Sequence, residues 1–134
     1  MQKWTATIAS CAVAAAFLAA PALEAKPKPT GEQRLTRMLE GRQAGEPVSC
    51  IPAYTTNRVT VIRNTALVYT SGRTIYVNRP ANPRTLNEGD VLVVDRLGHQ
   101  LCNTDMMHTR SQGSTSFRTG SVFLGQFVPY TKVG

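Results

Sequence analysis

The chain has 134 residues and a formal net charge of +7 at pH 7, with 15 lysines and arginines against 8 aspartates and glutamates. This length suits one small domain. The arginines are scattered along the chain, with neither a block of charge nor interleaved aromatic residues, so we expect no nucleic-acid partner.

The first 25 residues are predicted to be a secretion signal. Lys3 precedes an almost wholly apolar, alanine-rich run over residues 8–20, and small residues in a proline-rich segment follow it. The run is about a dozen residues long, which is too short to cross a bilayer comfortably. Cleavage after Ala22 or Ala25 would leave a periplasmic or secreted chain without a transmembrane segment. A retained anchor is the alternative.

The cysteine count predicts one disulfide. Cys11 leaves with the signal, so that Cys50 and Cys102 remain of the three cysteines in the sequence. An even number of cysteines in a small exported domain is typical of a disulfide. A loop of about fifty residues would contribute around 4 kcal/mol in the chain-entropy model. The alternative is a free, reactive thiol at Cys102.

The mature chain opens with a leader and a helix. Residues 26–30 are charged and proline-rich, so we expect a flexible leader followed by a single domain over residues 31–134. One short amphipathic helix is predicted over residues 31–43, ended by Gly41 or Gly45. Its apolar stripe consists of Leu35, Met38 and Leu39.

Everything after the helix is predicted to be β structure. Turn signals at residues 70–73 and 87–90, and a proline-rich loop at 78–85, separate the strands. The run at 91–94 is apolar on both faces, which is typical of a central strand. The fold class is therefore mainly β, a small antiparallel barrel or sandwich with one N-terminal amphipathic helix across an open end or edge. The predicted strands are residues 47–51, 58–62, 66–69, 74–78, 91–94 and 121–130.

One segment, HQLCNTDMMH, has metal-ligand residues at every third position: His99, Cys102, Asp105 and His108. Residues three apart on a strand face opposite sides, and a disulfide would consume the thiol, so we predict neither a metal nor another cofactor. Asp105 is predicted instead to fix the turn that presents Cys102, or else to be a solvated loop acid. Gly125 and Pro129 are predicted to bend and end the last strand.

Three short motifs occur in order: SCI at 49–51, LCNTD at 101–105 and LGQFVPY at 124–130. Together they resemble a family of small secreted bacterial proteins of unknown function, which share Cys-Ile, Leu-Cys-x-x-Asp and Leu-Gly-x-Phe-x-Pro. The resemblance covers nearly the whole mature chain, and the first cysteine pair of the family matches Cys50 and Cys102. A second pair that the family often has is missing, since Val122 stands at one of its positions. The resemblance implies no activity.

The sequence carries no nucleophile elbow, glycine-rich phosphate loop or histidine-rich metal motif. We therefore expect a non-catalytic exported module that binds an anionic envelope component or an exported protein. One alternative is an inhibitor of an exported enzyme, similar to the periplasmic lysozyme inhibitors, although SGRTIY is one residue longer than their Ser-Gly-x-x-Tyr loop. A small hydrolase or thiol enzyme centred on Cys102 is a weaker alternative. The candidate binding surface comprises Arg73, Tyr76, Arg79 and Arg84.

Overall fold

The fold was analysed in a computed structural model, which describes residues 21, 23, 25–95, 98–113 and 117–134. The predicted signal thus lies almost wholly outside the described residues. Within them, no helix is long and apolar enough to span a bilayer. The elements, with η marking 3₁₀-helices, are α1 (Gly31–Met38), β1 (Arg42–Ala44), β2 (Cys50–Pro52), η1 (Ala53–Arg58), β3 (Val59–Ile62), β4 (Ala66–Ser71), β5 (Thr74–Asn78), η2 (Pro83–Thr85), β6 (Asp90–Asp95), β7 (Gln100–Cys102), β8 (Met106–Ser111), β9 (Arg118–Val122) and β10 (Phe127–Lys132).

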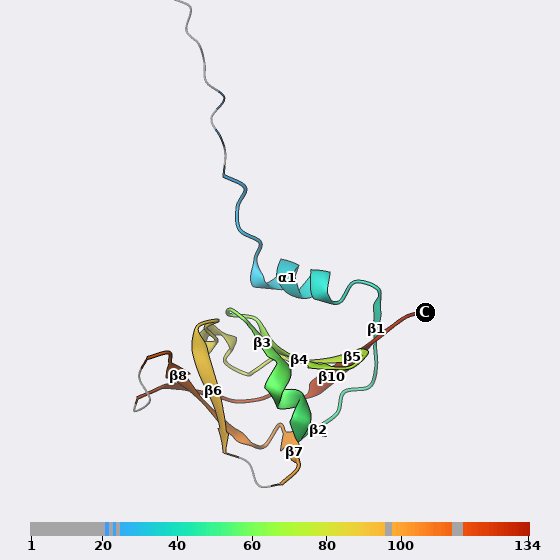
Figure 1. Cartoon of the computed structure of the whole chain (residues 1–134), viewed down its shortest axis with the longest axis vertical. Coiled ribbons are helices and arrows are strands. Elements are labelled where there is room, and N and C mark those ends of the chain that lie inside the picture. The colour runs from blue at the N-terminus through green and yellow to red at the C-terminus, as the bar shows by residue number, and fades with distance from the viewer. Residues whose placement is uncertain (1–20, 22, 24, 96–97, 114–116) are drawn as a thin grey trace, which may run out of the picture.

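The protein is mainly β, and its strands form three antiparallel sheets. The largest has the order β1-β10-β5-β4-β3, the smallest pairs β2 with β7, and the third has the order β6-β8-β9 (Figure 1). The described strands do not close into one barrel, which corrects the barrel expectation. The predicted strand at 91–94 is present as β6, but its predicted central position is wrong, since β6 lies at an edge of the three-stranded sheet.

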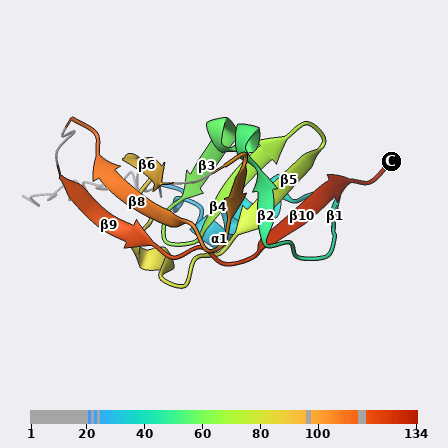
Figure 2. The same cartoon turned by 90° about the horizontal axis from the view of Figure 1, so that it is seen from below.

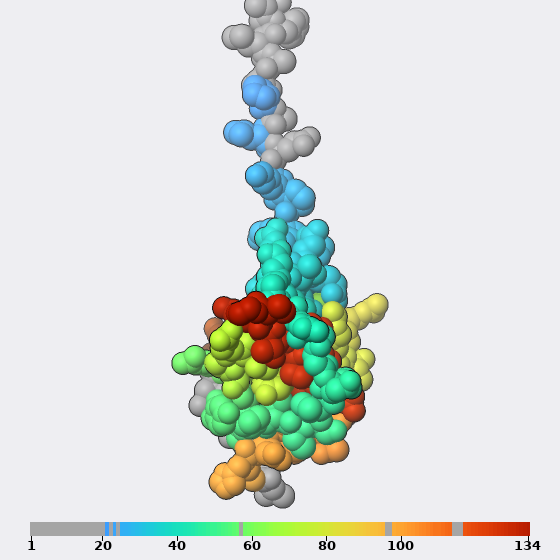
Figure 3. Space-filling view, turned by 90° about the vertical axis from the view of Figure 1, so that its right-hand side faces the viewer, coloured from blue at the N-terminus to red at the C-terminus, as the bar shows by residue number. Residues whose placement is uncertain are grey.

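The single α-helix is shorter than predicted. Thr30 and Gln33 form a capping box at its start, each side chain bonding the other residue's backbone N–H. The helix ends at Met38 instead of residue 43, and Gly41 then adopts a φ of 69° that favours glycine. The chain turns there and enters β1, which pairs with β10. Figure 3 shows this side of the molecule, with the C-terminal segment beside β1 and below α1.

The core lies on both faces of the five-stranded sheet, because residues of β4 alternate between the two faces. Ala66 and Val68 pack with Leu35 of α1, which covers one face (Figure 1). Leu67 and Tyr69 belong to a second cluster on the other face. The β2–β7 ribbon and the three-stranded sheet cover that face and contribute Ile51, Leu101, Met107 and Val122 to the cluster.

The last predicted strand is divided in the structure. β9 ends at Val122 and β10 begins at Phe127, with Gly125 in the break. A Cβ on Gly125 would lie 2.5 Å from the carbonyl oxygen of Arg79, so the close approach requires glycine. The buried Asn78 amide donates to the Gly125 carbonyl at 2.6 Å and accepts from its N–H at 3.0 Å. Pro129 lies inside β10, which continues to Lys132.

Tyr69 provides a test of the core. Its side chain is buried in an edge-to-face contact with Phe127, and its hydroxyl makes no hydrogen bond within the described structure. Burial also raises the pKa of this hydroxyl.

We predict that Tyr69→Phe raises the free energy of unfolding by about 1 kcal/mol, because it removes a buried polar atom that lacks a partner. Urea denaturation measures this change. The matched control is Tyr54→Phe, whose side chain is 71% exposed and should leave stability unaltered. A loss of stability in Tyr69→Phe would contradict the prediction.

Candidate functional site

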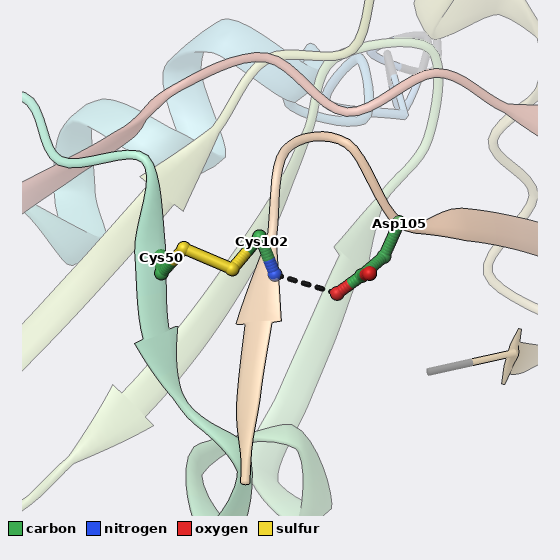
Figure 4. Close-up of a disulfide and its surroundings, with 3 residues drawn as sticks. All are labelled: Cys50, Cys102 and Asp105. Carbon is green, nitrogen blue, oxygen red and sulfur yellow. Dashed lines mark hydrogen bonds between the residues drawn. A yellow bond between two sulfur atoms is a disulfide. The ribbon is translucent and has the colours of Figure 1, made fainter. Parts of the chain in front are cut away.

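The segment HQLCNTDMMH forms strand β7, a turn and the start of β8 (Figure 4). Cys50 and Cys102 lie directly opposite each other in the β2–β7 ribbon, with a Cα–Cα distance of 4.0 Å, and form a disulfide. The predicted pairing is therefore present in the structure. Neither sulfur is a free thiol there, so neither offers a nucleophile or a thiolate ligand.

Asp105 lies in the turn that follows Cys102. Its Oδ2 accepts a hydrogen bond of 2.7 Å from the Cys102 N–H, while the Asp105 N–H donates to the Cys102 carbonyl at 3.0 Å (Figure 4). Each residue thus donates its backbone N–H to the other, and the two bonds together close the turn. This geometry is the one expected of a turn-fixing aspartate next to a disulfide.

The two histidines of the segment lie apart. His99 is exposed before β7, whereas His108 is buried in the middle of β8, in a different sheet. Within the residues that the structure describes, no three His, Cys, Asp or Glu side chains gather as a metal site. The spacing of three residues thus does not bring the four side chains together.

His108 instead lies between Asp95 and Ser121, and the sequence did not reveal this polar row of three side chains. Its Nε2 lies 3.4 Å from Oδ2 of Asp95, and its Nδ1 lies 3.4 Å from Oγ of Ser121. Serine, histidine and aspartate are the residues of a catalytic triad, but both contacts are long and 63% of the Asp95 side chain is exposed. The row follows from strand register: Ser121 is opposite His108, and Asp95 is diagonal to it.

The predicted binding surface is spread over several elements. Arg73 lies in the β4–β5 turn and Arg79 follows the other end of β5, so the strand separates them. Tyr76 packs partly buried against the core, and Arg84 is exposed on η2. The role of these four residues in binding stays a prediction.

The structure reveals a cavity of about 680 Å³ where the leader meets the domain. Its walls are the leader with the first turn of α1, the β3–β4 turn, and Glu88 in the loop before β6. The basic residues in the lining are Lys28, Arg34 and Arg63, and the acidic ones are Glu32 and Glu88. No sequence motif joins these residues, because they come from three segments that only the fold brings together.

Close contacts hold the walls in place. A Cβ on Gly31 would overlap the Thr65 side chain and lie 2.9 Å from the Arg63 carbonyl oxygen, so the helix start lies directly on the β3–β4 turn. In that turn, the Asn64 N–H donates to the Leu86 carbonyl at 3.2 Å. The Thr65 hydroxyl donates to the Arg63 carbonyl at 2.9 Å. These two bonds hold the backbone that directly follows Arg63.

Each of the two carboxylates that line the cavity forms an ion pair with an arginine. Arg34 pairs with Glu88, and Arg79 pairs with Glu32 through bonds of 2.6 and 3.1 Å. The hydrogen bond from Arg79 lowers the pKa of the Glu32 carboxyl, and Glu32 in turn raises the pKa of Arg79. Lys28 and Arg63 have no acidic partner within the described part of the chain. The cavity thus contains two uncompensated positive charges.

Comparisons with known proteins identify no relative: no protein-family model, curated protein or solved structure matches the chain. The resemblance of its motifs to the family of small secreted bacterial proteins therefore stays a prediction.

The disulfide provides a stability prediction. We expect the double variant Cys50→Ser/Cys102→Ser to lose about 4 kcal/mol of unfolding free energy, because the bridge closes a long loop in the unfolded chain. The two cysteines are 52 positions apart. Guanidinium denaturation with and without reductant measures the loss. Reductant should destabilise the parent protein and leave the stability of the double variant unaltered. If the parent and the double variant are equally stable without reductant, the estimate is wrong.

Proposed function

We propose that the protein is an exported, non-catalytic binding module whose cavity beside α1 takes a negatively charged group of an envelope component. The predicted secretion signal and the disulfide support export, since disulfides persist in oxidising compartments. The net charge of +7 favours an anionic ligand.

The observation that carries the proposal is the pair of uncompensated cations that line the open cavity beside α1. Lys28 and Arg63 line it from opposite segments, the leader and the β3–β4 turn. Arginine offers a planar, bidentate donor to phosphate or carboxylate, and lysine offers a compact charge with three donors. An anion between them would receive hydrogen bonds from both walls.

Arg34 adds a third donor that Glu88 holds in position. This ion pair is partly exposed, with 39% and 47% of the two side chains accessible, so it contributes little to stability. A ligand phosphate that bonds Arg34 would replace the Glu88 carboxylate as the partner of the guanidinium. Glu32 repels an anion less than a free carboxylate would, because Arg79 neutralises it.

The size of the cavity indicates the size of the ligand. At about 680 Å³ it lies within the range of ordinary small-molecule sites. A single phosphorylated or carboxylated sugar unit fits such a volume better than an isolated ion does. We therefore expect recognition of one charged unit of a larger envelope molecule.

The structure gives no specific support to the two alternative functions, an inhibitor of an exported enzyme and a thiol enzyme centred on Cys102. The Arg73 guanidinium donates to the Gly134 carbonyl at 3.1 Å, and the Arg73 carbonyl accepts from Arg42 at 2.7 Å, so the β4–β5 turn is attached to neighbouring segments. An inhibitory loop would need to project from the domain. A thiol enzyme would need the sulfur of Cys102, which is bonded to Cys50.

Titration with glucose 6-phosphate, followed by NMR, tests the cavity. We expect saturable shifts in the amides of Gly31, Asn64 and Thr65, and none with glucose, which has the same ring without the charge. Arg63→Gln should raise the dissociation constant about tenfold or more, because a hydrogen bond to a charged group is lost.

The matched control is Arg58→Gln, which removes the same charge from an exposed residue that does not line the cavity. It should leave the dissociation constant within about twofold of the parent value, given that screening weakens distant surface charges. If both variants weaken binding equally, the ligand responds to overall charge and the cavity is not its site.

A further inference from the structure

The open edge of β1 is a second surface of the molecule. β1 pairs with β10 alone among the described strands, and it lies at the end of the domain opposite β8 and β9 (Figure 2). Residues 43–46 are exposed, on the side of the molecule that Figure 3 shows. An edge strand presents backbone N–H and C=O groups with which another strand can pair.

The ladder between β1 and β10 shows which backbone groups of β1 point to the open side. The Gly45 N–H donates to a carbonyl of β10 at 2.7 Å, and the Gly41 carbonyl accepts from the residue that follows β10 at 3.0 Å. Hydrogen-bonded and non-hydrogen-bonded pairs alternate in an antiparallel ladder. Gln43 therefore directs its backbone groups toward β10, while Arg42 and Ala44 direct theirs to the open side.

Most of these outward groups are unoccupied. The Arg42 N–H donates to the Leu39 carbonyl at 3.1 Å, which leaves the Arg42 carbonyl and both backbone groups of Ala44. Within the described residues, these groups and the Glu46 N–H make no backbone hydrogen bond outside the β1–β10 ladder. The open edge thus offers a short row of donors and acceptors to a further strand.

The edge of β9 shows how the same fold covers an edge elsewhere. The Asn82 side-chain amide donates to the Ser121 carbonyl at 3.1 Å, and the Ala81 N–H donates to the Phe123 carbonyl at 3.0 Å. A covering loop is one of the usual protections of an edge strand. On β1, Leu39 occupies one N–H and leaves the rest of the edge open among the described residues.

We propose that β1 pairs with β1 of a second copy of the chain, antiparallel and about a two-fold axis at Ala44. Each Ala44 N–H then donates to the Ala44 carbonyl of the other copy, and each Arg42 carbonyl accepts from Glu46. This register also places the side chain of Arg42 opposite that of Glu46, twice because of the symmetry. Opposite charges directly across a strand pair stabilise it.

The outward groups and the charges select this register. A pairing centred on Arg42 would place two arginines opposite each other, which destabilises a strand pair. A pairing centred on Gln43 would require the Arg42 N–H, which Leu39 already occupies. The pairing centred on Ala44 avoids both problems, so the edge is complementary to itself, as a two-fold dimer requires.

The surroundings of β1 leave room for the second copy. A hollow of about 300 Å³ lies beside the strand, and its lining includes Gln43, Gly45 and Lys132. In the proposed register, Gln43 of one copy lies opposite Gly45 of the other, which has no side chain. The two five-stranded sheets then join into one continuous sheet.

The net charge of +7 opposes this association without preventing it. At physiological ionic strength, exposed charges more than about 8 Å apart are largely screened, so that the contacts at the edge decide the outcome. The contact is small, and we expect a weak dimer that forms as the protein concentration rises. The edge shares no residue with the cavity beside α1, so this inference is independent of the proposed function.

Sedimentation velocity over a series of protein concentrations tests the pairing. The chain from residue 26 onward is used, because the apolar run at residues 8–20 would associate by itself. This form retains α1 and all ten described strands, and its cooperative thermal unfolding is verified first. We expect a monomer–dimer equilibrium in the parent protein.

Ala44→Pro tests the edge. It removes the N–H that the second copy needs, and it keeps the bonds to β10 because that N–H points away from β10. The dissociation constant of the dimer should rise about tenfold or more, because two hydrogen bonds are lost by symmetry. The thermal unfolding of this variant checks that its fold is intact.

Glu46→Arg tests the register, because it places an arginine opposite Arg42 and should also raise the dissociation constant about tenfold. The matched control is Glu40→Arg, which makes the same change of charge at an exposed residue outside the strand and should have a smaller effect. The exchange Arg42→Glu/Glu46→Arg restores opposite charges and should recover part of the loss.

Three results would overturn the inference. A parent protein that stays monomeric at every concentration would show that the edge does not pair. A dimer that persists in Ala44→Pro would use a different surface. Equal weakening by Glu46→Arg and Glu40→Arg would mean that net charge, and not the register, controls association.

Discussion

The burial of strand β4 on both sides is the constraint on which the rest of the fold depends. Four successive residues, 66–69, are each at most 1% exposed. A strand with no solvated face requires a cover on each side of its sheet. One short helix is enough on one side, where it contributes Leu35. The other side is covered by two small sheets, and a disulfide fixes the strand pairing of one of them.

The candidate cavity results from this covering. The cavity forms where the first turn of α1 meets the end of the β3–β4 hairpin, and Gly31 is the residue that permits so close a contact. There, the elements needed to bury β4 bring together charged residues that the core does not use.

The parts of the structure that the sequence predicted are those with a local signal. Two mature cysteines have one possible pairing, and an aspartate three residues after Cys102 suits a turn. The helix end was misplaced because apolar spacing continues past Met38, whereas the positive φ of Gly41 interrupts the helix. Strands β7 and β8 were missed because neither consecutive methionines nor the polar segment before them alternates in hydrophobicity.

The sites were not predictable, because they depend on register and on contacts between distant segments. Nothing in the sequence places Arg63 and Lys28 in the lining of one cavity. The apolar run at 91–94 predicted a central strand, because burial on both faces is the natural explanation for such a run. The structure places that run on an edge strand, with Val91 half exposed.

Net charge and local geometry would contribute differently to binding in the proposed cavity. A net charge of +7 attracts any anion and by itself selects none. In the cavity, selectivity would come from geometry, since the Asn64 N–H and the Thr65 hydroxyl make hydrogen bonds that hold the backbone next to Arg63. Because salt screens the attraction between an anion and the two cations, binding by the cavity should weaken as the ionic strength rises.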